Sequence, residues 1–152
     1  MALKGHDLVI RGDDQDNKFS IAGSGDSFII ARLDETTTIN GRTDPPVTII
    51  GVTGGVFIKT KRGSDEVQIL GGTSIQRALE IHAGFGDDIL RLNGQMGSPI
   101  TVGGELNIHA SLGNDRVEAG WLSVGGKATI DTSDGTDTVL LGGGSSFGKD
   151  LS

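Results

Sequence analysis

The sequence predicts an all-β fold, a right-handed β-solenoid (parallel β-helix) of about six coils with three short strands each. Three observations predict it: glycine supplies 26 of the 152 residues, apolar residues alternate over short stretches, and one twelve-residue pattern recurs. Glycine favours turns, and a period of two is typical of strands with one buried face. A pattern that recurs along the whole chain is the signature of a repeat fold.

Six twelve-residue segments align without gaps, and each has isoleucine at its third position. The segments begin at Leu8, Phe28, Val56, Leu79, Leu106 and Ala128, on average 24 residues apart. Apolar residues also occupy positions one and twelve, and often position fourteen. This spacing predicts two short strands with a shared inward face and a turn between them.

A third strand is expected before each of the last four segments, within residues 49–56, 74–79, 100–106 and 122–128. Strands this short bury a face only when equivalent strands of successive coils pair in parallel, about 4.8 Å apart. A helical fold is excluded because no window sustains apolar residues at i, i+3, i+4 and i+7.

We expect a single domain over residues 1–152, with irregular N-terminal coils or a cap over 1–47, regular coils over 48–141 and a flexible tail over 142–152. Phe147 is the one residue of that tail able to plug the core. An uncapped terminal coil exposes edge strands. Self-association through the solenoid ends is therefore one expectation, and a module of a longer solenoid is the other.

Composition excludes several functions. The net charge of −7 disfavours nucleic acid as a partner. No stretch reaches the roughly 18 apolar residues of a membrane span. Nucleophilic catalysis lacks support because the chain has no cysteine and no Gly-x-Ser-x-Gly turn.

Aspartates recur at position ten of the last four segments, where position eight is glycine; they are Asp65, Asp88, Asp115 and Asp137. Stacked coils would align them at one corner. We favour hydrogen bonding of these carboxylates to backbone amides of the turn. The alternative is calcium coordination, since calcium prefers oxygen ligands. The first two segments carry Asn17 and Thr37 there, and each removes a charge from a metal site. No cofactor is required by the pattern.

Two outward positions are also of interest. Position two would align Val9, Ile29 and Phe57 in an exposed apolar row, to be covered by residues 40–47, by the N-terminus or by a partner subunit. Position four would place His82 and His109 on neighbouring coils. A shared transition metal is conceivable there, but solvent-facing histidines without metal are favoured.

The pattern VGG-x-L-x-I followed by G-x-D-x-V-x-L, over nearly all of residues 48–141, resembles the degenerate β-helix repeats of large secreted or surface proteins of cyanobacteria and planctomycetes. The segments GFGDDIL and LGNDRV are also similar to the glycine-aspartate calcium repeats of secreted RTX proteins. The first resemblance implies a passive extracellular or cell-surface module, a rigid spacer or adhesin-like protein, with no catalytic residues.

The alternative function is a carbohydrate-active β-helix that binds or cleaves a polysaccharide in an outer groove. Its candidate residues are Asp87 and Asp88 beside Arg91 and Arg116. We favour a protein that is not an enzyme, because paired carboxylates without a cleft are weak support for acid–base chemistry. Among the aromatic side chains, Trp121 is the one we expect to offer a platform for sugar.

Overall fold

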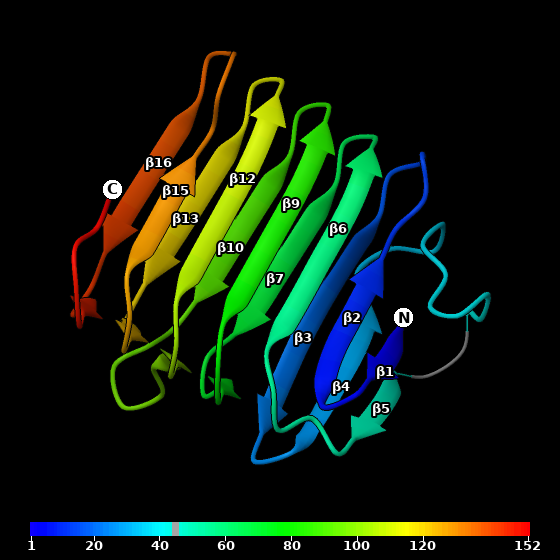
Figure 1. The fold of residues 1–152 in the computed structure, drawn as a ribbon. Coiled ribbons are helices and arrows are strands. Elements are labelled where there is room, and N and C mark those ends of the chain that lie inside the picture. The colour runs from blue at the N-terminus through cyan, green and yellow to red at the C-terminus, as the bar shows by residue number, and fades with distance from the viewer. Residues whose placement is uncertain (44–45) are drawn as a thin grey trace.

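The structure is a computed structural model that describes residues 1–43 and 46–152. It is all-β, and the described residues include no helix. Three sheets form the walls of a stack of coils (Figure 1).

Sheet A contains β1 (Ala2–Lys4), β2 (Asp7–Arg11), β6 (Val56–Arg62), β9 (Leu79–Phe85), β12 (Leu106–Leu112) and β15 (Ala128–Asp131). Sheet B contains β16 (Thr138–Gly142), β13 (Arg116–Gly120), β10 (Ile89–Asn93), β7 (Glu66–Leu70), β3 (Lys18–Ser24), β4 (Ser27–Arg32) and β5 (Val47–Ile50). Sheet C contains β17 (Ser146–Phe147), β14 (Leu122–Val124), β11 (Ile100–Val102) and β8 (Ser74–Ile75).

The last four repeat segments form coils that take one strand from each sheet. From β6 onward the chain passes from sheet A to sheet B to sheet C, and equivalent strands of successive coils pair in parallel. The isoleucines of position three pair in register along sheet A; they are Ile10, Ile58, Ile81, Ile108 and Ile130. The predicted β-solenoid is therefore confirmed for about four three-stranded coils, preceded by the two strands β2 and β3.

The second repeat segment does not form a coil, and this part of the six-coil prediction is wrong. Its strand β4 pairs antiparallel with β3, so that Ile30 lies opposite Ile21. The reversal occurs at Gly25 and Asp26, which form a two-residue turn with Gly25 at φ +66°. Two-residue loops with positive φ favour hairpins. β2 consequently stacks directly on β6, with no coil between them.

The hairpin closes the N-terminal end of the stack. β4 pairs antiparallel with both β3 and β5, and β1 pairs antiparallel with β2, so both long sheets leave the parallel pairing at this end (Figure 1). Phe28 and Ile30 on β4 are each only 1% exposed. These side chains cover the end of the core, so the β3–β4 hairpin forms a cap on the first coil.

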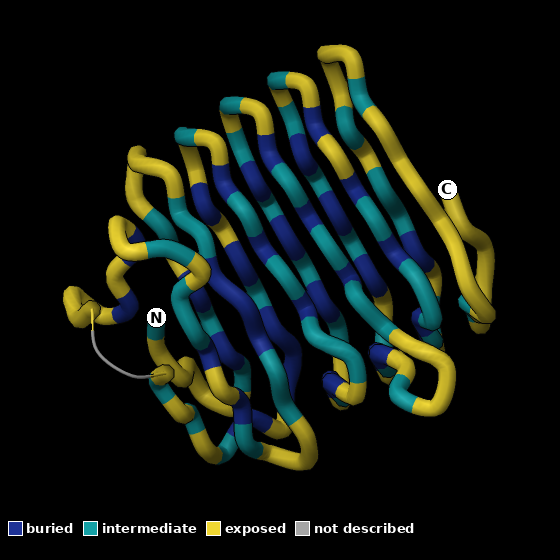
Figure 2. The backbone as a smooth tube through the Cα atoms, turned by 180° about the vertical axis from the view of Figure 1, so that it is seen from behind, coloured by how far each residue is buried: buried dark blue, intermediate teal, exposed yellow. Residues whose placement is uncertain are grey.

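The C-terminal end is open. The strand β16 is exposed along its whole length (Figure 2). Its Val139 and Leu141 align with buried residues of β13, yet they are 43% and 44% exposed. Within residues 142–152, β17 pairs in parallel with β14 and Leu151 bridges Ala128. The end of the chain continues the path of the coils along sheet C and back to sheet A.

Candidate functional site

The predicted aspartates lie together at the corner between sheets A and B. Asp65, Asp88 and Asp115 follow β6, β9 and β12, and each is at most 2% exposed. Asp137 occupies the same corner of the last coil and is half-buried. Three acidic side chains buried in one place need specific partners, since an unpaired buried charge is costly.

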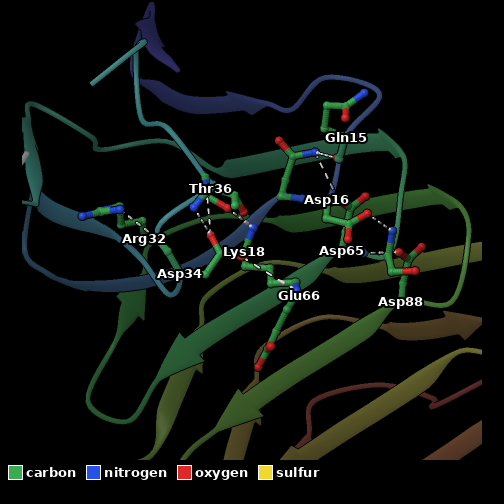
Figure 3. A network of polar contacts seen from close by, with 12 residues as sticks. Gln15, Asp16, Lys18, Arg32, Asp34, Thr36, Asp65, Glu66 and Asp88 are labelled. Carbon is green, nitrogen blue, oxygen red and sulfur yellow. Dashed lines mark hydrogen bonds and ion pairs between the residues drawn. The ribbon is translucent and has the colours of Figure 1, made fainter. Parts of the chain in front are cut away.

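Hydrogen bonds between coils connect these side chains into what we term the aspartate ladder, composed of Asn17, Asp65, Asp88, Asp115 and Asp137. The Asp65 amide donates to Oδ1 of Asp88 at 2.8 Å (Figure 3), and the Asp88 amide donates to Oδ1 of Asp115 at 2.9 Å. The Asn17 amide donates to Asp65 at 2.6 Å, and the Asp115 amide to Asp137 at 2.9 Å. Each aspartate thus fastens its coil to the preceding one through a backbone amide that no strand pairs.

Thr37, expected at the same corner of the second segment, lies outside the ladder. Because that segment folds back as β4, its following residues do not start a new coil. The Thr37 hydroxyl accepts a hydrogen bond from the Lys18 amide at 2.8 Å instead. Thr37 therefore fastens the cap to β3.

The second carboxylate oxygen of each buried aspartate is unsatisfied. Oδ2 of Asp65, Asp88 and Asp115 is buried and has no hydrogen-bond partner. Burial is the main reason why the pKa of all three carboxyls is raised, and for Asp88 the pKa reaches about 7. The neighbouring Asp65 and Asp115 raise the Asp88 pKa further, because ionising one member of the ladder opposes ionising the next.

This arrangement predicts that stability falls as pH rises through neutrality. The Asp88 pKa is higher in the folded chain than in the unfolded one, so folding favours the protonated acid, and that stabilisation is lost as pH rises through about 7. We expect the free energy of unfolding to fall by roughly 2 to 4 kcal/mol between about pH 4 and about pH 8. Urea titrations across that range measure it.

Asp88→Asn is the matched variant, because its amide oxygen can still accept the Asp65 amide while the group no longer titrates. We expect a shallower pH dependence and higher stability than the parent chain at about pH 8. An Asp88→Asn curve that parallels the parent curve would contradict a neutral Asp88 in the ladder.

A second ladder runs beside the first on the exposed side of the corner. The Ser64 amide donates to Asp16 Oδ1 at 2.8 Å, the Asn114 amide to Asp87 Oδ1 at 2.8 Å, and the Thr136 amide to Asn114 Oδ1 at 3.0 Å. Sequence reasoning missed it. The signal is the recurrence of short polar side chains at position nine, next to the aspartates.

The described residues contain no group of three or more His, Cys, Asp or Glu side chains placed to hold a metal ion. The Oδ1 atoms of the aspartate ladder already accept backbone amides. Calcium needs six to eight oxygen ligands. The side chains of the ladder alone do not supply such a set.

His82 and His109 are neighbours on β9 and β12, as expected. Their rings stack with centroids 4.9 Å apart and planes inclined by 16°. His82 Nε2 lies 2.5 Å from Oε1 of Glu80, and His109 Nδ1 lies 3.7 Å from Oδ2 of Asp131. The carboxylates on the same outer face are thus the polar partners of the two imidazoles.

The predicted apolar row does not form. Val9 and Phe57 are neighbours on sheet A, whereas Ile29 lies on β4 in sheet B, opposite Ala22 and Thr48. The hairpin is the cause, since it removes the second segment from sheet A. The segment 40–47, one expected cover for the row, includes residues 44 and 45, which are outside the described residues.

The arginines of the alternative catalytic set are engaged in ion pairs on sheet B. Arg91 pairs with Glu66 and, at 3.2 Å, with Glu118, which also pairs with Arg116. Arg116 and Arg91 lower the pKa of Glu118. Asp88 is buried in the ladder. This network cross-links coils, and it does not bring the arginines to a shared acid–base site with Asp88.

The fold and the aspartate ladder together define the class of protein: an all-β solenoid whose coils are held in register by buried aspartates. Comparison with models of protein families, with curated proteins and with solved structures finds no match to this chain. No helix of the described residues is long and apolar enough to cross a membrane.

Proposed function

We propose that this chain is a rigid module of a secreted or cell-surface protein, a spacer with an interaction surface and without catalytic activity. The observation that carries the proposal is mechanical: backbone pairing in three parallel sheets and the aspartate ladder connect each coil to the next along one axis. We further propose that the solenoid is right-handed, because parallel strand crossovers strongly favour that hand.

We also propose that the module associates through its open C-terminal end with the same end of a second copy. Val139 and Leu141 are inward side chains without a covering coil, and β16 and β17 are edge strands there. The opposite end has its core covered by Phe28 and Ile30. Contact between two identical open ends would bury core residues on both copies and close after one step, so that it forms a dimer.

Sedimentation velocity at several concentrations tests this association. We expect the parent chain to dimerise and the double variant Val139→Lys with Leu141→Lys to stay monomeric, because charges would replace the apolar contact. Leu140→Lys is the matched control, since Leu140 is 47% exposed on the same strand but aligns with the outward Glu118. A parent chain that is monomeric at all concentrations, or a control that fails to dimerise, would contradict the end-to-end contact.

Calcium stabilisation of the aspartate corner stays a prediction. Binding to the ladder would favour ionised carboxylates and would therefore oppose the raised pKa of Asp88. Melting curves at about pH 8 with calcium and with a chelator separate the alternatives. A large increase in melting temperature with calcium, abolished by Asp88→Asn, would support a metal site. Identical melting curves would mean that hydrogen bonds alone stabilise the aspartate ladder.

A further inference from the structure

Four cations gather on the outer face of sheet A, and we term them the basic strip: Arg11, Lys59, Lys61 and Arg62. All four are exposed. None of them forms an ion pair within the residues that the structure describes. The chain has a net charge of −7, so four adjoining cations on one face form a local region of opposite sign. An anion would therefore bind more favourably to this positive region than to the acidic parts of the surface.

The strip borders two adjoining hollows, of about 240 Å³ and about 590 Å³. Lys59 and His82 line both hollows, which makes them one continuous surface. Val9 and Phe57 line the first hollow and give it an apolar part. The arrangement offers apolar contact and positive charge side by side.

Local contacts hold part of the strip in place. The Arg62 guanidinium lies over the Phe85 ring, 5.7 Å from its centroid, in a cation–π contact. Arg11, Lys59 and His82 are in-register partners on successive strands, so they follow one another at about 4.8 Å. The four cations therefore lie together on two neighbouring strands, with Lys59, Lys61 and Arg62 along β6 and Arg11 beside Lys59 on β2.

Two carboxylates also line these hollows. Glu80 in the first hollow contacts His82 at 2.5 Å, and Asp14 lies in the second hollow. The four cations outnumber them, and Glu80 is already engaged by an imidazole. The basic strip therefore keeps a positive balance.

We infer that the basic strip binds an acidic polysaccharide, an extended chain of sugars that carry carboxylate groups. Cations that extend along β6 and onto β2 on an open surface suit an extended polymer, and the apolar part of the first hollow suits the C–H face of a sugar ring. Nucleic acid, with its far denser charge, is repelled more strongly by the net charge of −7. This inference deepens the proposed interaction function.

Titration calorimetry with an oligogalacturonate of defined length tests the inference at low and high salt. We expect binding that weakens with salt and falls about tenfold in Lys59→Glu with Lys61→Glu, because two attractive contacts become repulsive. Lys127→Glu with Lys149→Glu is the matched control: it changes the net charge equally, away from the hollows, and should retain binding. Melting curves of both double variants check that the solenoid is intact.

The inference would be overturned by no binding to the parent chain, by equal binding of the methyl-esterified oligosaccharide, or by equal loss of binding in the control variant. Tighter binding of inorganic polyphosphate than of oligogalacturonate would also overturn it, because the strip would then select charge density and not a glycan. The test is independent of dimerisation, since the strip lies on the face of sheet A and not at the open end. Absence of polysaccharide binding and absence of dimerisation can therefore be distinguished from each other.

Discussion

Replacing Ile81 with aspartate is expected to unfold the chain at room temperature. Ile81 is fully buried and pairs with Ile58 and Ile108 on the two neighbouring strands. The substitution removes about 2 to 3 kcal/mol of apolar burial and adds the cost of an unpaired buried carboxylate, which is several kcal/mol more. A domain of this size has about 5 to 15 kcal/mol of stability in total.

Far-ultraviolet circular dichroism and thermal melting measure the outcome of Ile81→Asp. Asn107→Asp is the matched control, since it places aspartate on the outer face of the neighbouring strand β12. We expect the control to melt within a few degrees of the parent chain. A cooperative transition of Ile81→Asp near that of the control would mean that Ile81 is not part of a continuous core.

Gly113→Ala is expected to have the second-largest effect, about 3 kcal/mol or more. Gly113 precedes the aspartate ladder with φ +142°, a conformation that side chains other than glycine rarely adopt. A Cβ atom at this position would lie 2.0 Å from the carbonyl oxygen of Gly86 on the preceding coil. Alanine at this position would therefore push two coils apart at the corner where Asp115 accepts the Asp88 amide.

The variant Gly97→Ala separates the two causes of the expected loss of stability in Gly113→Ala, which are backbone strain at positive φ and the clash with the neighbouring coil. Gly97 also has positive φ, +83°, but a Cβ atom there meets nothing within 4 Å. Its replacement should cost about 1 to 2 kcal/mol, from backbone strain alone. Chemical denaturation of both variants gives the comparison, and equal losses would argue against close contact between coils at Gly113.

The inward residues of the last four coils could be predicted from the sequence, because position three must be apolar on every coil that stacks. The hairpin could not be predicted from the same pattern. Alternation with a period of two is identical for a strand read in either direction, so Phe28 and Ile30 match the repeat even though β4 runs antiparallel to β3. The Gly25–Asp26 pair between two apolar runs was the available signal for the reversal.

The aspartate corner was predictable in position but not in its partners. A short polar side chain at a turn commonly accepts a nearby amide of the same turn. In this solenoid the donor is instead the equivalent amide of the neighbouring coil, for example that of Asp65 for Asp88. Local sequence carries no information on that choice, because it depends on the rise from one coil to the next. Outward surfaces such as the basic strip are still less predictable, since their members come from strands up to 48 residues apart.

Disulfide formation between engineered cysteines tests the central claim most directly, that β2 stacks on β6 because the second segment folds back as a hairpin. The chain has no cysteine of its own. Val9 and Phe57 are in-register partners on adjacent parallel strands, so their Cα atoms lie about 4.8 Å apart, within disulfide range. Val9→Cys with Phe57→Cys should therefore form an intramolecular disulfide, whereas Val9→Cys with Ile29→Cys should not. A disulfide in the second pair and none in the first would contradict the hairpin and restore a coil between β2 and β6.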